Sequence, residues 1–182
     1  MKAKIAQLAM LVALTAGSVN VANAASSAVV TIKGAINTVT CDVKASQQTI
    51  QLPNMTPADV AAVGAFATGK TTDFSVSLNN CTGTNDTTSL ARLQITGPTT
   101  ATGETYFSDD ASSPVAVGLA LKSAPTTLLS NNSVQHVSAA NDAANAIDGQ
   151  KLELTAGVIS STATITSGHA VSAPITFTYV YN

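Results

Sequence analysis

The chain has no tryptophan, and aromatic residues make up only 4% of its 182 residues. Charged side chains account for 10%, and eight basic against ten acidic residues give a net charge of −2. The basic residues are scattered along the sequence, so they form no stripe that could follow a phosphate backbone. We therefore expect no nucleic-acid partner.

Long hydrophobic runs are also missing, since no stretch approaches the ~20 consecutive apolar residues that a membrane-spanning helix needs. A shorter apolar run, 8–16, follows two lysines and precedes the small residues Ala22 and Ala24. This order is typical of a secretory signal peptide, whereas an amphipathic N-terminal helix would not explain it. We predict that residues 1–24 are cleaved on export, that the mature chain begins at Ala25, and that it inserts into no membrane.

The mature chain has the length of one domain. Removal of 24 of the 182 residues leaves 158, enough for a substantial core and short of what two domains normally need. Six basic residues then remain against ten acidic ones, so the net charge of the exported part is −4. No linker or internal repeat divides this part of the sequence.

Cysteine is scarce, with only Cys41 and Cys81. Both lie in the exported part, and two cysteines can pair without remainder in an oxidising compartment. We therefore predict one disulfide. A metal site is the weaker interpretation because His136 and His169 stand at no recognisable ligand spacing from the cysteines. We expect neither a metal nor a cofactor.

Catalytic motifs are absent from the sequence. There is no G-x-S-x-G nucleophile elbow and no glycine-rich phosphate loop. The two histidines could join one of the many serines and an aspartate in a triad, but abundant serine is no evidence for one. The aspartates considered are Asp109, Asp110, Asp142 and Asp148. The adjacent pair Asp109-Asp110 is expected in a solvated turn, because neighbouring residues of an extended chain point to opposite sides. We predict that the protein is not an enzyme.

The residues that dominate the mature chain are Ser, Thr, Val and Ala, and long amphipathic helices are missing. This composition, with strand signals recurring between turn signals, predicts an all-β fold. The prolines all fall between the expected strands or at their edges, where a missing N–H does not interrupt a ladder. The strands are expected at 29–39, 39–43, 49–52, 73–78, 92–96, 115–121, 151–156, 161–165 and 175–181.

Two segments do not fit a strand. Residues 56–67 start with Thr56 and Pro57, which suit the first positions of a helix, so one short helical turn is expected there. Residues 138–147 are rich in alanine but also in Asn and Asp, and their pattern fits a loop and a short helix equally well.

The hydrophobic phase changes near the start of the mature chain. Val30 and Ile32 share one phase, whereas Val39 and Cys41 share the other, which indicates a bulge or a break. The part before Gly34 can therefore be a separate strand-forming arm outside the disulfide loop. It can equally be the first strand of an ordinary sandwich, because the pattern fits both.

The end of the chain has a strict period of two, as expected of a half-buried strand. One face carries Ile175, Phe177, Tyr179 and Tyr181, and the other carries Thr176, Thr178 and Val180. Because no further strand follows, this one must find its partners elsewhere in the fold or in another molecule.

Three features together resemble the major pilin subunits of chaperone–usher fimbriae of the type 1-like kind. They are the segment 32–36 followed by Cys41, a second cysteine in the segment 78–81, and the alternating terminal strand with Tyr181 in the penultimate position. Their order, their spacing and the predicted export make the resemblance, which spans nearly all of residues 25–182.

The resemblance implies an incomplete immunoglobulin-like β-sandwich that lacks its last strand and so exposes a hydrophobic groove. A strand of a periplasmic chaperone fills the groove first, and the N-terminal arm of the next subunit replaces it by donor-strand exchange. The implied organisation is a signal peptide 1–24, a donor arm 25–33 and a pilin domain 34–182. The implied donor side chains are Ala28, Val30 and Ile32, and the implied groove and chaperone-pairing residues are Ile175, Phe177, Tyr179 and Tyr181.

The function implied is that of a structural subunit of an extracellular fimbria that supports cell adhesion. Its implied partners are neighbouring copies of the same pilin, the periplasmic chaperone and the outer-membrane usher. The nine-residue arm is shorter than in many major pilins, and the segment 152–156 lacks the Tyr and Arg usual before the last strand. A shaft subunit, a minor adaptor and a terminator therefore stay open, and the arm favours the shaft.

A tip adhesin with a carbohydrate-binding surface is the alternative function. Tyr106 and Phe107 lie in a turn flanked by Gly and Asp and could contact a sugar there. The more frequent arrangement places one such aromatic residue in the core and its neighbour outward.

Overall fold

The structure is a computed structural model and describes residues 39–60, 62–83, 90–137, 144–165 and 168–181. The predicted signal peptide, the predicted arm 25–33 with Ala28, Val30 and Ile32, and the phase change before Val39 lie outside the described residues.

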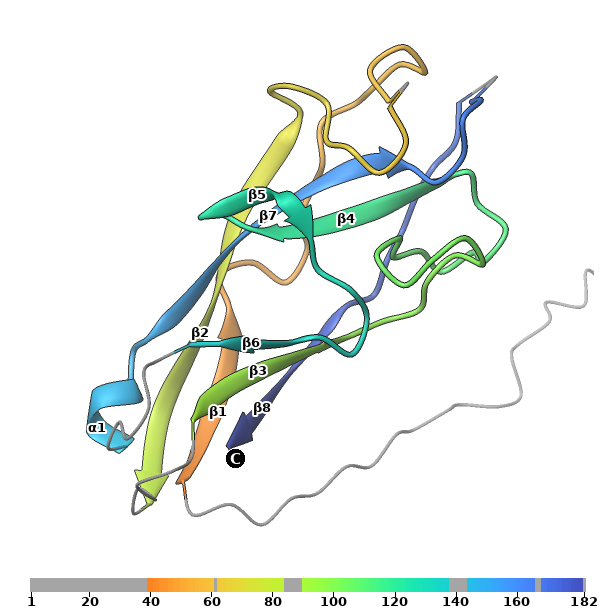
Figure 1. Cartoon of the computed structure of the whole chain (residues 1–182). Coiled ribbons are helices and arrows are strands. Elements are labelled where there is room, and N and C mark those ends of the chain that lie inside the picture. Colours follow the sequence, from red (N-terminus) through yellow and green to blue (C-terminus); the bar gives the residue numbers. More distant parts are fainter. Residues whose placement is uncertain (1–38, 61, 84–89, 138–143, 166–167, 182) are drawn as a thin grey trace, which may run out of the picture. The chain divides into compact units, whose positions relative to one another are not determined.

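The chain folds into two antiparallel sheets (Figure 1). The larger sheet has the strand order β1-β2-β7-β4-β5, and the smaller has the order β6-β3-β8. The all-β prediction is thereby confirmed. The elements are β1 (Val39–Ala45), β2 (Thr71–Gly83), β3 (Ala91–Thr96), β4 (Val115–Leu121), β5 (Ala124–Leu128), β6 (Val134–His136), α1 (Ala144–Ile147), β7 (Lys151–Ser160) and β8 (Thr176–Tyr181).

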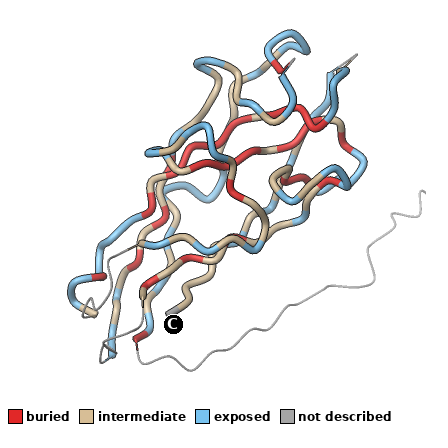
Figure 2. Tube along the Cα trace, viewed as in Figure 1, coloured by how far each residue is buried: buried red, intermediate tan, exposed pale blue. Residues whose placement is uncertain are grey.

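The core lies between the two sheets, and alternation along the strands decides which side chains enter it. On β2, Phe74, Val76 and Leu78 are buried while the intervening residues face away. On β3, Leu93 and Ile95 are fully buried in the same way. Figure 2 shows this alternation, and it shows burial that is nearly continuous along β4 and β7.

The near-continuous burial of β4 and β7 means that the larger sheet is covered on both faces at its centre. Leu119 and Leu154 point into the main core. Ala116, Ala120 and Ile159 have the opposite phase and are also fully buried. A second, smaller apolar layer therefore covers the outer face of this sheet.

Most of the expected strands are present. The expectations at 39–43, 73–78, 92–96, 115–121, 151–156 and 175–181 each coincide with a strand or with most of one, and 115–121 matches β4 at both ends. Strands β2 and β7 run several residues further than expected, because they pair with each other and with β1 and β4 along those extra residues.

Two expected strands are wrong. Residues 49–52 have the alternation of a strand, and Ile50 and Leu52 pack against the core, but no neighbouring strand pairs with their backbone. Residues 161–165 form bends instead, where the Ser161 hydroxyl donates to the Ser113 carbonyl at 3.0 Å. Alternation in one segment cannot show whether a second segment lies beside it.

Strands β5 and β6 were not expected. Four of the five β5 side chains are polar, small or proline, and β6 has only three residues, so neither carries a readable hydrophobic period.

The two segments that do not fit a strand form short local structures. The helical turn expected in 56–67 is a hydrogen-bonded turn, in which the Asp59 carboxylate accepts from the Thr56 backbone N–H at 2.7 Å and from its hydroxyl at 2.9 Å. Of the segment 138–147, the last residues form the short helix α1 and residues 138–143 lie outside the description.

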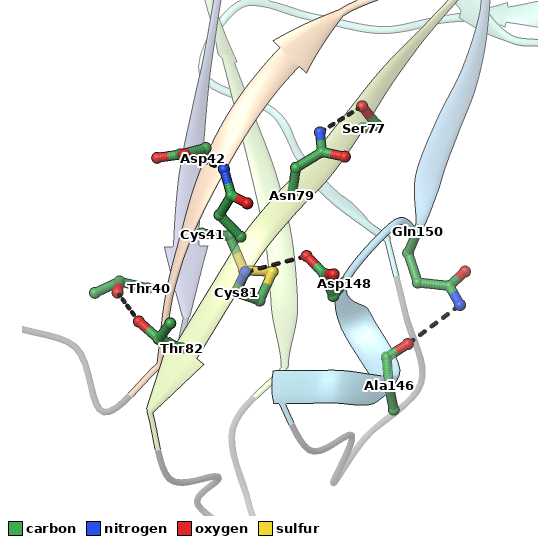
Figure 3. Close-up of a disulfide and its surroundings, with 11 residues drawn as sticks. Thr40, Cys41, Asp42, Ser77, Asn79, Cys81, Thr82, Ala146, Asp148 and Gln150 are labelled. Carbon is green, nitrogen blue, oxygen red and sulfur yellow. Dashed lines mark hydrogen bonds between the residues drawn. A yellow bond between two sulfur atoms is a disulfide. The ribbon is translucent and has the colours of Figure 1, made fainter.

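The predicted disulfide is present and joins β1 to β2, with an S–S distance of 2.13 Å (Figure 3). The register of these strands shifts between Thr40 and Asp42, so Cys41 sits at a bulge. The backbone N–H of Cys81 donates to the Asp148 carboxylate at 3.1 Å, which ties the end of α1 to β2.

Loss of this disulfide should weaken the fold. Because it closes a loop of 40 residues, the chain-entropy estimate gives about 4 kcal/mol of the free energy of unfolding. We expect the Cys41→Ser, Cys81→Ser double variant to lose an amount of this order in urea unfolding, with a larger m-value because its unfolded chain is less compact. Addition of reductant should lower the stability of the parent chain by a similar amount and leave the double variant unchanged. Equal stability of the oxidised and reduced parent would contradict the estimate.

A charged group on the outer face of the larger sheet links three strands. The Thr155 hydroxyl on β7 donates to the Asp73 carboxylate on β2 at 2.7 Å, and the Lys122 ammonium, just after β4, lies 2.9 Å from the same carboxylate. The hydrogen bond and the ammonium lower the pKa of Asp73 below its usual value of 3.8. The same carboxylate raises the pKa of Lys122.

This lowered pKa gives a pH-dependent contribution to stability. A carboxyl with a depressed pKa in the folded state stabilises the fold above its unfolded pKa, and the contribution is lost as the pH falls through the lower folded pKa. We expect Asp73→Asn to be slightly less stable than the parent at pH 6 and equally stable at pH 2, in urea unfolding. The effect should be small because both side chains are about half exposed. Adding Lys122→Gln to Asp73→Asn should change little further, because the ion pair is already broken.

Candidate functional site

An open groove of about 1130 Å³ lies along one side of the sandwich. Two stretches of chain form its walls: the first wall is residues 47–57, which follow β1, and the second wall is residues 168–177, which lead into β8. Apolar side chains of the larger sheet form its floor. They are Phe74, Val115, Val117, Leu119, Ala156 and Val158.

The first wall is an extended segment without strand partners. Among the described residues, none of 47–55 takes part in a backbone–backbone hydrogen bond. Ile50 and Leu52 hold it to the core by packing. Side chains add two contacts, since the Thr72 hydroxyl donates to the Gln51 carbonyl at 3.2 Å and the Lys70 ammonium to the Asn54 carbonyl at 3.4 Å.

The second wall pairs on one side only. β8 pairs with β3 along six residues, and within the described part of the chain no strand pairs with its other edge. Upstream of β8, the Ser172 carbonyl accepts from the Asp109 N–H at 2.8 Å. Phe177 meets Phe74 across the mouth of the core, with ring centroids 6.2 Å apart in an edge-to-face arrangement.

The opposite side of the sandwich is better closed. Strand β5 carries Pro125 and its pairing with β4 shifts register between Ala120 and Leu121, while β6 is only three residues long. Residues 129–133 connect these two edges directly. Proline, an irregular register and short length are the features by which proteins protect strand edges. The β8 edge has none of them over its six residues.

Two of the four predicted groove residues, Ile175 and Phe177, line the groove from the second wall and are half-buried. Tyr179 lies further along β8, outside the lining of the groove, and packs against the core. The backbone of Tyr181 pairs with Ala91, and its side chain lies outside the description.

Sequence reasoning missed the first wall and the floor of the groove. The signal for the first wall was present in the alternation of Ile50 and Leu52, but it was interpreted as a paired strand. The floor residues look like ordinary core positions in the sequence, and four of the six are buried. Only Val117 and Val158 are half-buried, because no described segment covers them fully.

The residues considered for catalysis do not form a constellation. His136 is on β6 and His169 is exposed on the second wall, while Asp142 lies outside the described residues. Asp110 accepts from the hydroxyl and the backbone N–H of Ser112 at 2.7 and 2.8 Å, and these bonds lower the pKa of its carboxyl. It occupies an exposed turn, as expected. Within the described ranges no three His, Cys, Asp or Glu side chains gather as a metal site would need.

The aromatic pair considered for sugar binding is part of the fold. Phe107 is fully buried, and its backbone exchanges hydrogen bonds of 3.0 and 2.8 Å with Val117. The Tyr106 ring is half-buried against Gly64 and Gly103. This is the arrangement with one core aromatic that the sequence favoured.

No helix in the described portion of the chain has the length and apolar character required to cross a bilayer.

Comparison with known proteins agrees with this geometry. The family described as fimbrial protein matches residues 30–182, whereas no curated protein matches the chain. The P pilus rod subunit PapA has 19% identity and a TM-score of 0.54, over 84% of this chain and 98% of PapA. Its likeness shows that the two proteins share a fold.

Two further solved structures are similar at a lower level. An antigen and type I fimbria protein of Burkholderia pseudomallei has 20% identity and a TM-score of 0.48, over 79% of this chain and 99% of its own. A chain from a chaperone-usher pilus has 16% identity and a TM-score of 0.49, over 87% and 97%. Since the family match covers more than four fifths of the sequence, this chain belongs to the fimbrial protein family and is a pilin, a structural subunit and not an enzyme.

Proposed function

We propose that this pilin polymerises into a chaperone–usher fimbria by donor-strand exchange, with the groove as the site where a strand of a neighbouring subunit inserts. The observation that carries the proposal is the open groove beside β8, a strand that pairs on one side only within the described chain, opposite a first wall whose residues 47–55 have no backbone–backbone hydrogen bonds there.

An inserted strand would both supply backbone partners for the groove walls and cover apolar side chains of the groove. Its backbone can pair with β8 at Thr176 and Phe177, which line the groove, and, on its other side, with the N–H and C=O groups of the first wall. Its alternate side chains can cover Val117, Val158 and Phe177, which are half-buried around the groove. Covering apolar surface contributes about 25 cal/mol per Å². Main-chain pairing supplies affinity, and the side chains set the register.

The donor in this proposal is the arm 25–33 of the next copy, with Ala28, Val30 and Ile32 facing the floor. These residues alternate with a period of two, as a strand in such a groove requires. Copies joined in this way form a homopolymer, and the presence of a donor arm favours a shaft subunit over an adaptor. Adhesion would then be a property of the assembled extracellular fibre.

Export and assembly complete the proposal. Residues 1–24 would direct the chain to the periplasm, where a chaperone strand fills the groove before the usher passes subunits to the fibre. An uncovered groove would otherwise leave a long unpaired edge beside apolar surface, which favours aggregation.

The acceptor role can be tested at adjacent residues of β8. We expect Tyr179→Asp to abolish co-purification with the periplasmic chaperone and to cause periplasmic degradation, because the charge would enter the core-facing side of the groove strand. Thr178→Asp, on the opposite face, is the matched control and should bind at the level of the parent. Equal chaperone binding by both variants would contradict the acceptor role.

The donor role can be tested at the arm. A chain without residues 25–33 should still bind the chaperone, since its groove is intact, but should not extend a fibre. Electron microscopy of surface fibres and chaperone co-purification measure the two activities separately. A chain with Ser26 and Ser27 replaced by Ala is the control, because these changes precede the alternating donor residues. Fibres of normal length from the deletion variant would refute the donor role.

A further inference from the structure

Two glycines lie opposite each other at the centre of the larger sheet. Gly118 on β4 is the register partner of Gly157 on β7. A β-carbon on Gly157 would lie 2.8 Å from Cδ1 of Phe66, and one on Gly118 would lie 2.9 Å from Cε1 of the same ring. The Phe66 ring therefore rests directly on the backbone of both strands, in a hollow that side chains would fill.

This hollow lies on the face of the sheet that is opposite the groove. Successive residues of a strand point to opposite faces. Val117 and Val158, which precede Gly118 and follow Gly157, are register partners of each other and line the groove floor. Phe66 is thus across one sheet thickness from the groove, within the outer apolar layer that contains Ile159.

The same connection between β1 and β2 supplies both the first wall and Phe66. Residues 47–57 pass along the inner face of the larger sheet, and Phe66 lies on its outer face. Between them the N–H of Gly64 donates to the Ser160 carbonyl at 3.0 Å, and Val63 forms a bridge with the same residue of β7. The connection therefore contacts both faces of the larger sheet and passes the end of its central strand, β7.

Besides the packing of Ile50 and Leu52, the first wall depends on its ends for its position, because residues 47–55 have no backbone–backbone hydrogen bonds in the described chain. At one end, the Ser46 N–H donates to the Ser75 carbonyl at 2.8 Å. At the other end, the contacts of Gly64 and Phe66 with β7 and β4 hold the chain. Loss of the Phe66 contact would leave this second end with much less apolar packing.

We propose that Phe66, seated on the Gly118–Gly157 pair, is a positioning residue that holds the first wall where an inserted strand can pair with it. This inference rests on the proposed strand-accepting function of the groove. In this proposal, the distance between the two walls of the groove is fixed by a contact on the opposite face of the sheet. Phe66 itself does not contact the inserted strand.

The test uses the mature chain in monomeric form and a fluorescent synthetic peptide of residues 25–37. We expect Phe66→Ala to raise the dissociation rate of this peptide about tenfold, which corresponds to about 1.4 kcal/mol. Phe66→Leu, which keeps an apolar side chain on the glycine pair, should restore the rate to within about twofold of the parent. Val63→Ala is the matched control, because Val63 is 48% exposed and its bridge to Ser160 uses only the backbone.

Hydrogen exchange of the peptide complex separates positioning from general stabilisation. In the parent complex the amides of 49–52 and of β8 should both be protected. In Phe66→Ala the protection should be lost at 49–52 and kept in β8, β2 and β7. Gly157→Ala should give the same result, because its new β-carbon displaces the ring from below.

Each other outcome overturns a defined part of the argument. If the parent chain does not bind the peptide, the strand-accepting function itself fails. If the parent binds and Phe66→Ala binds and protects 49–52 equally, the function stands and the positioning role is wrong. If Phe66→Ala loses protection throughout β2 and β7, Phe66 is a general stabiliser of the sheet and the positioning role is again wrong.

Discussion

The one-sided strand pairing of β8 is the feature on which the rest of the structure depends. This strand pairs with β3 through six residues, and in the described part of the chain no strand pairs with its other side. Its first residues, Thr176 and Phe177, line the groove. A backbone edge that is unpaired beside apolar side chains is costly to expose and ready to accept another strand. In the proposed function, the smaller sheet gains its missing strand at β8.

Other parts of the fold leave less strand edge exposed than β8 does. Disulfide-linked β1 and β2 form one boundary of the larger sheet, and the bulge at Cys41 adjusts their register. At the other boundary, Pro125 and a direct connection from β5 to β6 leave little edge to extend. The proposed strand addition is consequently directed to the groove, where residues 47–55 of the first wall have no backbone–backbone hydrogen bonds in the described chain.

The shortage of charge and aromatic residues has a structural meaning in a pilin. With Phe107 in the core and Phe66 on the outer face of the larger sheet, the aromatic rings pack against the protein itself. The ionic group at Asp73 links β2 and β7 to the residue just after β4, and it lies on the face away from the groove. The chemistry of this protein is that of backbone pairing and apolar burial.

Local pattern was sufficient for much of this description. Period-two alternation predicted β8 and the core-facing phase of Phe177 and Tyr179, and the cysteine count predicted the disulfide. These features depend on the residues of one segment or on the number of residues of one type. Strands such as β5 and β6 could not be predicted in this way, because they are too short or too polar to carry a period of their own.

The sequence by itself determined which segments are extended, which of their faces are apolar, and that two cysteines are available to pair. Only the tertiary structure decided which extended segments have neighbours. Residues 49–52 alternate as clearly as a paired strand, yet they form a groove wall because none of the described strands pairs with them. Likewise, Gly118 and Gly157 are 39 positions apart, and they contact the Phe66 ring together only because β4 pairs with β7. Strand pairing and the contacts of Phe66 are relations between distant segments, and alternation within one segment contains no information about them.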